Sequence, residues 1–245
     1  MFRSLLARPH RALAEIGALA ALYAVYESVR GAGGPSLEAA RQHTADIVAL
    51  ERGLHVFHEQ QLQSAAHAVP ALPLLLGLAY MLLHFGGTAV AMRWIYRNRR
   101  DAFPLVRTAL VVSTAIALVG YVLYPAAPPR LAGLGFDDTV SSHTHVNLSS
   151  DALGALYNPY AAVPSLHFGY ALLVGGAIAF LARRRWMRVL GAVYPVFMLF
   201  DIVATGNHFL FDAAAAGAVV GAGAWVARRL VAEPALHHAL QPVAA

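Results

Sequence analysis

The sequence predicts an all-α polytopic membrane protein with six transmembrane helices and short interfacial helices on the outer face. Of its 245 residues, 58% are hydrophobic and only 13% are charged. The mean hydropathy is +0.55, which is higher than that of an ordinary soluble domain. The apolar residues also gather into six stretches close to the roughly 20 residues that a crossing helix needs: 12–30, 70–92, 104–124, 164–182, 186–204 and 208–227.

The first stretch resembles the start of a signal peptide, because Arg3, Arg8 and Arg11 precede it. It is long for such a peptide, it carries Glu15 and Glu27, and no clear cleavage site interrupts it. We therefore expect residues 1–34 to be a retained signal-anchor helix.

The arginines predict the orientation. They take the place of lysine throughout, and most of them fall on one side of a six-helix zigzag, which the positive-inside rule assigns to the cytoplasm. We expect a protein of the plasma (inner) membrane with both termini in the cytoplasm. The net charge of +5 follows from this topology, and no basic stripe interleaved with aromatic residues supports a nucleic-acid partner. The arginines on that side are Arg3, Arg8 and Arg11; Arg93, Arg97, Arg99, Arg100 and Arg107; Arg183, Arg184, Arg185 and Arg188; and Arg228 and Arg229.

The remaining segments complete the predicted organisation. Residues 35–69 mix charged and apolar side chains at a spacing typical of amphipathic helices at the outer interface. Residues 70–230 form a core of five transmembrane helices, and 231–245 form a cytoplasmic tail. The outward segment 125–163 is too long for an ordinary connection, which favours a functional role for it. The chain has no cysteine, so it can form neither a disulfide nor a thiolate metal site.

The last predicted helix begins with a histidine and an aspartate four residues apart. On a helix, His208 and Asp212 share one face with Cβ atoms about 5–6 Å apart. The aspartate can then bind one ring nitrogen and leave the other as a nucleophile or a base. A pair that merely joins transmembrane helices is an equally good interpretation when the pair is taken alone.

Other polar groups lie near this pair on the outer face. Pro164 suits the first turn of a helix, which places Ser165 and His167 in that turn. The helices at 164–182 and 208–227 both run inward from the outer face, so their N-termini converge there and favour an anion. Arg130 adds a fork of donors suited to phosphate, although an isolated arginine at a helix end often only anchors the headgroup region. Together these groups predict a phosphate site.

Three motifs resemble the type-2 phosphatidic acid phosphatase (PAP2) superfamily, and within it the branch that contains inositol phosphorylceramide synthase and its bacterial relatives. They are "YPAAPPR" (124–130), "NPYAAVPSLHFGYA" (158–171) and "TGNHFLFDAAAAG" (205–217). The resemblance covers about 70–230 and makes these residues the catalytic core. It implies that His208 forms a phosphohistidine, that Asp212 orients it, and that His167 protonates the leaving oxygen. It also implies a set of phosphate binders: Arg130, Ser165 and Asn207.

The function expected from these features is that of a membrane-embedded lipid phosphate phosphatase or phosphotransferase acting at the outer leaflet. Its substrate would be a phospholipid, a polyprenyl phosphate or another lipid phosphate. The intermediate would be hydrolysed or passed as a phospho-headgroup to a lipid or polyol alcohol. We expect no cofactor, no ATP and no metal, since the sequence lacks a phosphate-binding P-loop. Hydrolase versus transferase, the lipid and the oligomeric state stay open.

Two other classes of protein compete with this interpretation. A small proton-coupled transporter or channel would use the His/Asp pair as a relay, but it needs polar residues through the whole membrane thickness, whereas these gather at one face. A structural membrane protein would require the motifs, their order and the topology to coincide by accident.

A few further polar residues have weaker predictions. His84 is expected far from the outer surface as an interhelical hydrogen-bonding residue. Asp201 is expected to support the site or to cap a network. His143 and His145 are a weak zinc signal, because two histidines lack further ligands. A solvated turn, or less readily the substrate mouth, is expected for Asp137, Asp138 and Thr139.

Overall fold

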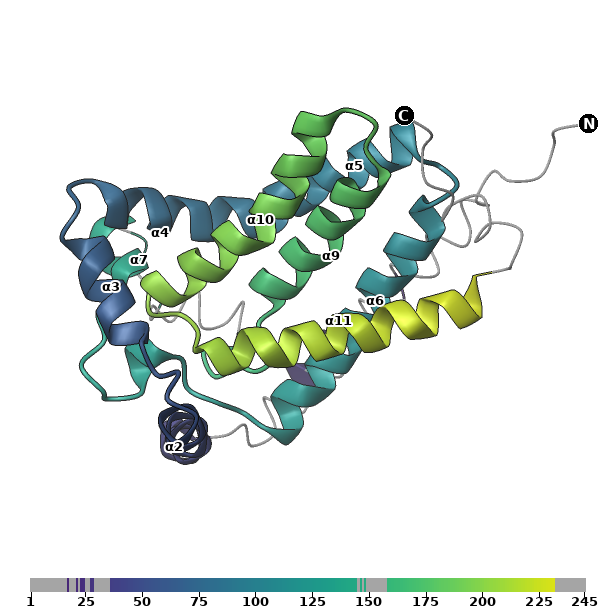
Figure 1. Ribbon diagram of the computed structural model, residues 1–245. Coiled ribbons are helices and arrows are strands. Elements are labelled where there is room, and N and C mark those ends of the chain that lie inside the picture. Colours follow the sequence, from purple (N-terminus) through teal and green to yellow (C-terminus); the bar gives the residue numbers. More distant parts are fainter. Residues whose placement is uncertain are drawn as a thin grey trace, which may run out of the picture.

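The computed structural model describes residues 36–144, 146, 148 and 158–231, together with a few positions between 17 and 28. Every regular element in these residues is helical, apart from one isolated bridge between Ala126 and Ala161. The all-α prediction is therefore confirmed for this part of the chain (Figure 1). The elements are α2 (Leu37–Gly53), α3 (Glu59–His67), α4 (Leu72–Leu82), η1 (Leu83–Gly87), α5 (Thr88–Asn98), α6 (Phe103–Leu123), η2 (Pro129–Leu131), α7 (Thr139–Thr144), α9 (Leu166–Leu181), α10 (Arg185–Ala204) and α11 (Leu210–Leu230).

Among the residues that the structure describes, four helices are long and apolar enough to cross a membrane. They are the continuous run Leu72–Asn98, made of α4, η1 and α5, together with α6, α10 and α11. The stretch expected at 164–182 corresponds to α9, which is apolar but has only 16 residues. The stretch expected at 12–30 lies almost wholly outside the described residues. Six spans therefore remain a prediction, of which four have the required length and composition.

Large apolar side chains are exposed along these helices. A surface of this kind on a monomer in water would be an unusually large apolar patch. It fits a protein that lies in a membrane, where lipid contacts these side chains. The most exposed examples on the four long helices are Leu75, Leu82, Phe85, Val90, Leu123, Val196, Trp225 and Leu230.

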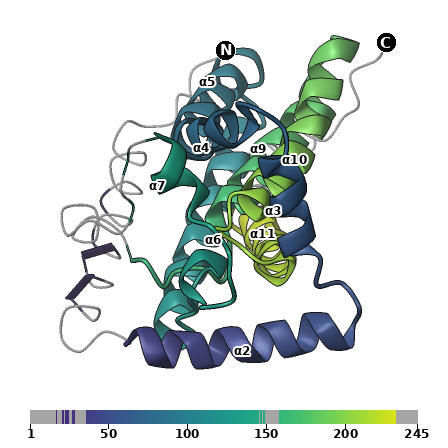
Figure 2. The same cartoon turned by 90° about the vertical axis from the view of Figure 1, so that its left-hand side faces the viewer.

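Small residues let the core helices approach one another closely, as is common between membrane helices. A Cβ atom at Gly175 of α9 would lie 2.6 Å from the carbonyl oxygen of Gly191 in α10. Conversely, a Cβ atom at Gly191 would lie 2.6 Å from the carbonyl oxygen of Gly175 in α9. No larger residue fits at this crossing. This close approach of the two glycines holds α9 and α10 side by side, as both views show (Figures 1 and 2).

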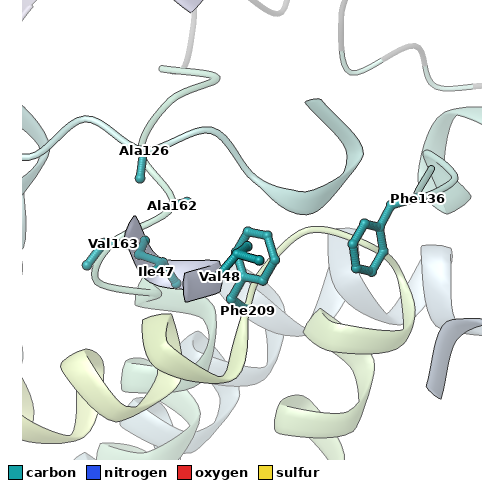
Figure 3. Close-up of a cluster of buried hydrophobic side chains, with 7 residues drawn as sticks. All are labelled: Ile47, Val48, Ala126, Phe136, Ala162, Val163 and Phe209. Atoms are coloured by element: carbon teal, nitrogen blue, oxygen red, sulfur yellow. The ribbon is translucent and has the colours of Figure 1, made fainter. Parts of the chain in front are cut away.

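The helix α2 lies across one end of the bundle. It is seen end-on in Figure 1 and lengthwise in Figure 2. The long helices α10 and α11, in contrast, extend across the view of Figure 1. Ile47 and Val48 on its buried face pack near Phe209, just before α11 (Figure 3). The sequence prediction of helices between residues 35 and 69 thus agrees with α2 and α3, which rest on the segments leading into α9 and α11. The rest of this hydrophobic cluster is Ala126, Phe136, Ala162 and Val163.

Candidate active site

A tight turn between α10 and α11 presents His208. The backbone N–H groups of Asn207 and His208 both donate to the carbonyl oxygen of Ile202, at 3.1 and 3.0 Å. Gly206 adopts a φ of +71°, and a Cβ atom there would lie 2.7 Å from the carbonyl oxygen of Asp137. Only glycine meets both conditions, because it lacks a Cβ atom and accepts positive φ at little cost. The backbone therefore fixes where His208 stands.

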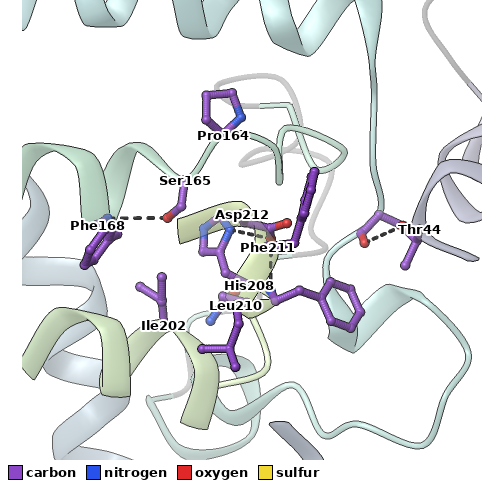
Figure 4. A network of polar contacts seen from close by, with 12 residues as sticks. Thr44, Pro164, Ser165, Phe168, Ile202, His208, Leu210, Phe211 and Asp212 are labelled. Atoms are coloured by element: carbon purple, nitrogen blue, oxygen red, sulfur yellow. Dashed lines mark hydrogen bonds and ion pairs between the residues drawn. The ribbon is translucent and has the colours of Figure 1, made fainter. Parts of the chain in front are cut away.

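The structure brings His208 and Asp212 into direct contact (Figure 4). The Nδ1 atom of His208 lies 3.1 Å from Oδ2 of Asp212, and the same oxygen accepts the backbone N–H of Phe209 at 3.0 Å. Both polar side chains are buried. Because an ionised carboxylate only accepts hydrogen bonds, Nδ1 carries the proton. Nε2 is then the unprotonated ring nitrogen, with a lone pair available for attack or for proton transfer.

The first turn of α9 places a second histidine beside the pair. His167 and His208 have ring centroids 6.0 Å apart. Ser165 is the N-cap of α9, and its hydroxyl accepts the backbone N–H of Phe168 at 3.4 Å. The N–H of Ser165 donates to the carbonyl oxygen of Asp212 at 3.1 Å, which ties the start of α9 to α11. Pro164 was expected inside the first turn but lies just before the N-cap, since the serine side chain takes the capping position.

The ring of His167 is held between two rings from the first long helix. Tyr80 stacks on it with a centroid distance of 4.1 Å, and His84 stacks on it at 4.0 Å. Two rings at such distances would overlap if they lay on one face, so they lie on opposite faces. His84 belongs to the π-helical turn η1 and is buried, and its Nδ1 atom has no hydrogen-bond partner. The sequence predicted an interhelical hydrogen bond for His84, and the structure shows a ring contact with His167.

Arg130 meets the same turn from the other side. Its Nε atom donates to Oδ1 of Asn207 at 2.9 Å, and its backbone N–H donates to the carbonyl oxygen of Gly206 at 2.9 Å. The side chain is 4% exposed and lies 4.0 Å from a carboxylate oxygen of Asp138. Two of the expected phosphate binders, Arg130 and Asn207, are therefore brought together next to His208.

The residues on either side of Asp138 differ in their exposure. The Asp137 side chain is 72% exposed, as expected for a solvated turn. Thr139, in contrast, is buried, and its hydroxyl lies 2.9 Å from Nε2 of His67. Thr139 is the first residue of α7, and this helix packs against α4, which places the threonine inside the protein.

The N-terminus of α11 is not open to an anion, which corrects the sequence-based expectation. Its first N–H groups are already taken by carboxylates of the protein. Leu210 donates to Oε1 of Glu59 at 3.1 Å, and Phe211 donates to Oε1 of Glu51 at 2.6 Å. These two glutamates were not predicted from the sequence as part of the site. The available signal was position, since Glu51 continues the buried helical spacing of Thr44, Ile47 and Val48 along α2.

The other candidates lie apart from this cluster. Asp201 is fully buried near the end of α10, and neither of its carboxyl oxygens has a hydrogen-bond partner. The ring of His143 lies 5.5 Å from that of His67. His145 lies outside the described residues. Within the part of the chain that the structure describes, no group of three His, Cys, Asp or Glu side chains is arranged to hold a metal ion.

Comparison with known proteins identifies the family. The model of the PAP2 superfamily matches residues 45–226. The match runs from the middle of α2 to the later part of α11, so it includes every group of the cluster around His208. Comparison with curated proteins found no match, and neither did comparison with solved structures. Since the family model covers well over half of the sequence, the chain belongs to the PAP2 superfamily.

Proposed function

We propose that the protein is a membrane-embedded lipid phosphate phosphatase or phosphotransferase that works through a phosphohistidine on His208. Membership of the PAP2 superfamily suggests phosphatase or phosphotransferase activity. The observation that carries the finer proposal is the pairing of two histidines. His208 has its Nδ1 atom on Asp212 at 3.1 Å, which leaves Nε2 free, and the ring of His167 lies 6.0 Å away between centroids.

In the first step, Nε2 of His208 attacks the phosphorus atom of the ester. A P–N bond forms while the P–O bond to the lipid breaks. His167 gives a proton to the leaving oxygen, and the Asp212 carboxylate balances the positive charge of the phosphorylated ring. Arg130 binds the phosphoryl oxygens, and its guanidinium offsets the charge that builds on them. The side chain of Asn207 accepts from Arg130 and donates to Thr205, so we assign it the role of holding the guanidinium in place. The hydroxyl of Ser165 is engaged as the cap of α9, so we assign Ser165 a role in shaping the phosphate site at the start of this helix.

In the second step, water or an alcohol attacks the phosphorus atom. The attacking oxygen gives its proton to His167, the P–N bond breaks, and its electron pair returns to Nε2 of His208. Water yields a free phosphate and completes a phosphatase cycle. A lipid or polyol alcohol yields a new phosphoester, as expected for the synthase-like branch that "YPAAPPR" resembles. The substrate class is a phospholipid, a polyprenyl phosphate or a related lipid phosphate at the outer leaflet.

The most direct test uses purified protein and a panel of lipid phosphates and phospholipids, with and without alcohol acceptors. Release of inorganic phosphate would support the phosphatase. A new phospholipid that appears only with an acceptor would support the transferase. If neither product forms from any member of the panel, the proposal is wrong.

The topology makes a separate prediction, because the arginines assign Asp137 and Asn98 to opposite sides of the membrane. The chain has no cysteine, so a single introduced thiol reacts without background. Cysteine in place of Asp137, whose side chain is 72% exposed, is expected to react with a membrane-impermeant reagent applied to intact cells. Cysteine in place of Asn98, which is exposed at the end of α5, should react only after the cells are opened. The reverse labelling pattern would show that the protein has the opposite orientation in the membrane.

Turnover is expected to survive removal of divalent metals. The proposed steps use only His208, His167, Asp212 and Arg130, and each charge that develops has a partner among them. Activity measured before and after dialysis against EDTA should agree within error. If EDTA abolished turnover and zinc restored it, His143 and His145 would become the first candidates for ligands.

A further inference from the structure

Three carboxylates take three successive N–H groups at the start of α11. Asp212 accepts from Phe209 at 3.0 Å, Glu59 accepts from Leu210 at 3.1 Å, and Glu51 accepts from Phe211 at 2.6 Å. Asp212 belongs to α11 itself, whereas Glu51 and Glu59 arrive from α2 and α3. Two helices outside the long spans are thus fastened to the turn that carries the proposed nucleophile.

The two glutamates are too deeply buried for ordinary surface carboxylates. Glu51 is 2% exposed and Glu59 is 0% exposed. One oxygen of each, Oε2, is buried and meets no donor. Their other oxygens accept the N–H groups of two adjacent residues, Leu210 and Phe211, so the two carboxyl groups lie side by side. Two charged carboxylates in this position would repel each other, and neither has a hydrogen to donate to the other.

We infer that Glu51 and Glu59 share one proton and act together as positioning residues for the His208–Asp212 pair. This inference rests on the proposed function. The shared proton lets one carboxyl donate to the other while both keep their α11 N–H groups. It also lowers the negative charge next to Asp212, so that the charge of Asp212 remains available to His208. Neither glutamate contacts the substrate; both act through the position of the turn.

The surroundings of Glu51 favour the protonated form near neutral pH. Burial, followed by the hydrogen bond to Glu59, raises the pKa of Glu51 from 4.5 to about 8, against the opposing effect of the Phe211 N–H. The titratable groups that face it are Glu59 from α3 and Asp212 from α11, with His208 bonded to the latter. Arg52, the next residue of α2, has its guanidinium over the ring of Phe57.

The sign of the pH effect follows from this direction. The folded protein binds the proton of Glu51 more tightly than the unfolded chain, so the stabilisation is complete below pH 4.5 and is lost as the pH rises through about 8. Above that value three carboxylates repel one another at one helix end. The repulsion separates α2 and α3 from α11, and turnover should decline together with stability.

The test compares Glu51→Gln with Glu51→Ala in purified full-length protein, by thermal unfolding midpoint and by turnover from pH 5 to 9. A glutamine still accepts the Phe211 N–H, and its amide group donates to Glu59 at every pH. Glu51→Gln should keep kcat near neutral pH and lose the alkaline decline in both measurements. Glu51→Ala leaves the Phe211 N–H and Glu59 without a partner, so kcat should fall about 10²-fold at every pH, as expected for a misplaced reacting group.

Glu38→Gln is the matched control, because Glu38 is an exposed glutamate on the same helix; its two curves should follow those of the wild type. Parallel unfolding curves for Glu51→Gln and the wild type would overturn the shared proton. Separated unfolding curves with identical kcat profiles would overturn the positioning role. The unfolding curves need no substrate, so a wild-type protein without turnover would count against the proposed function and not against the shared proton.

Discussion

Replacing His208 with alanine is expected to abolish turnover of every phosphate substrate. The nucleophile is needed whatever group leaves, so a good leaving group cannot compensate for its loss. The expected fall in kcat is roughly 10⁴-fold or more, as for other nucleophiles that work within a catalytic unit. Product release from a lipid phosphate and from p-nitrophenyl phosphate, measured side by side, tests this. Substantial turnover of either substrate by the variant would contradict the assignment.

Asp212→Asn is the informative companion to this variant. An asparagine oxygen can still accept the ring Nδ1–H of His208 and the backbone N–H of Phe209. The start of α11 should therefore keep its fold, and the protein should keep its unfolding midpoint. The neutral amide no longer balances a positive ring, and kcat on both substrates should fall by up to about 10⁴-fold, as for the buried aspartate of a serine protease triad. A large drop in the midpoint would instead mean that Asp212 matters mainly as a cap of α11.

The second large effect separates His167 from His208. A lipid alkoxide is a poor leaving group that needs a proton, whereas nitrophenolate hardly does. His167→Ala should therefore cost about 10²–10⁴-fold on a lipid phosphate, the usual range for general acid catalysis, and much less on p-nitrophenyl phosphate. Equal losses on both substrates would refute the general-acid role.

The same variant should make the intermediate visible. With a labelled activated substrate, the first step still proceeds in His167→Ala, while removal of the phosphoryl group is slowed because no base takes the proton of water. A rapid quench should trap a phosphoprotein that is labile in acid and stable in base, as a phosphohistidine is. If the label appeared on a His208→Ala protein, the nucleophile would have to be His167.

The sequence predicted those parts of the molecule that depend on local pattern. The apolar runs predicted the long helices because a buried or lipid-facing helix is apolar all round. The spacing of His208 and Asp212 predicted their contact, because residues four apart on a helix are neighbours. Local pattern does not reveal which ring nitrogen faces the aspartate. That became clear only from the structure, in which Nδ1 of His208 lies 3.1 Å from Oδ2 of Asp212.

Contacts between distant segments were the part that the sequence did not reveal. The sequence placed Glu51 and Glu59 only in amphipathic helices at the outer interface. The contacts of α2 and α3 with the start of α11 show that the two glutamates cap it. The site at the start of α11 was therefore expected to be open, while in the structure it is filled from outside the spans. The contact of His84 with His167 was not predicted for a similar reason, since it depends on how η1 and α9 pack.

The π-helical turn η1 has a consequence for everything that follows it in the first long helix. A residue added within a helix rotates the later part by about 100° relative to the earlier part. Because of this rotation, Tyr80 of α4 faces His167 at the start of α9, and Ile95 of α5 faces Leu181 at the other end of α9. A chain shortened by one residue between Leu83 and Gly87 would have to lose one of these two contacts. The turn sets the rotation of α5 relative to α4, so the length of this segment has to be kept. Two of its residues have to be kept as well: His84, which stacks on His167, and Gly87, where a Cβ atom would lie 2.7 Å from the hydroxyl of Tyr194.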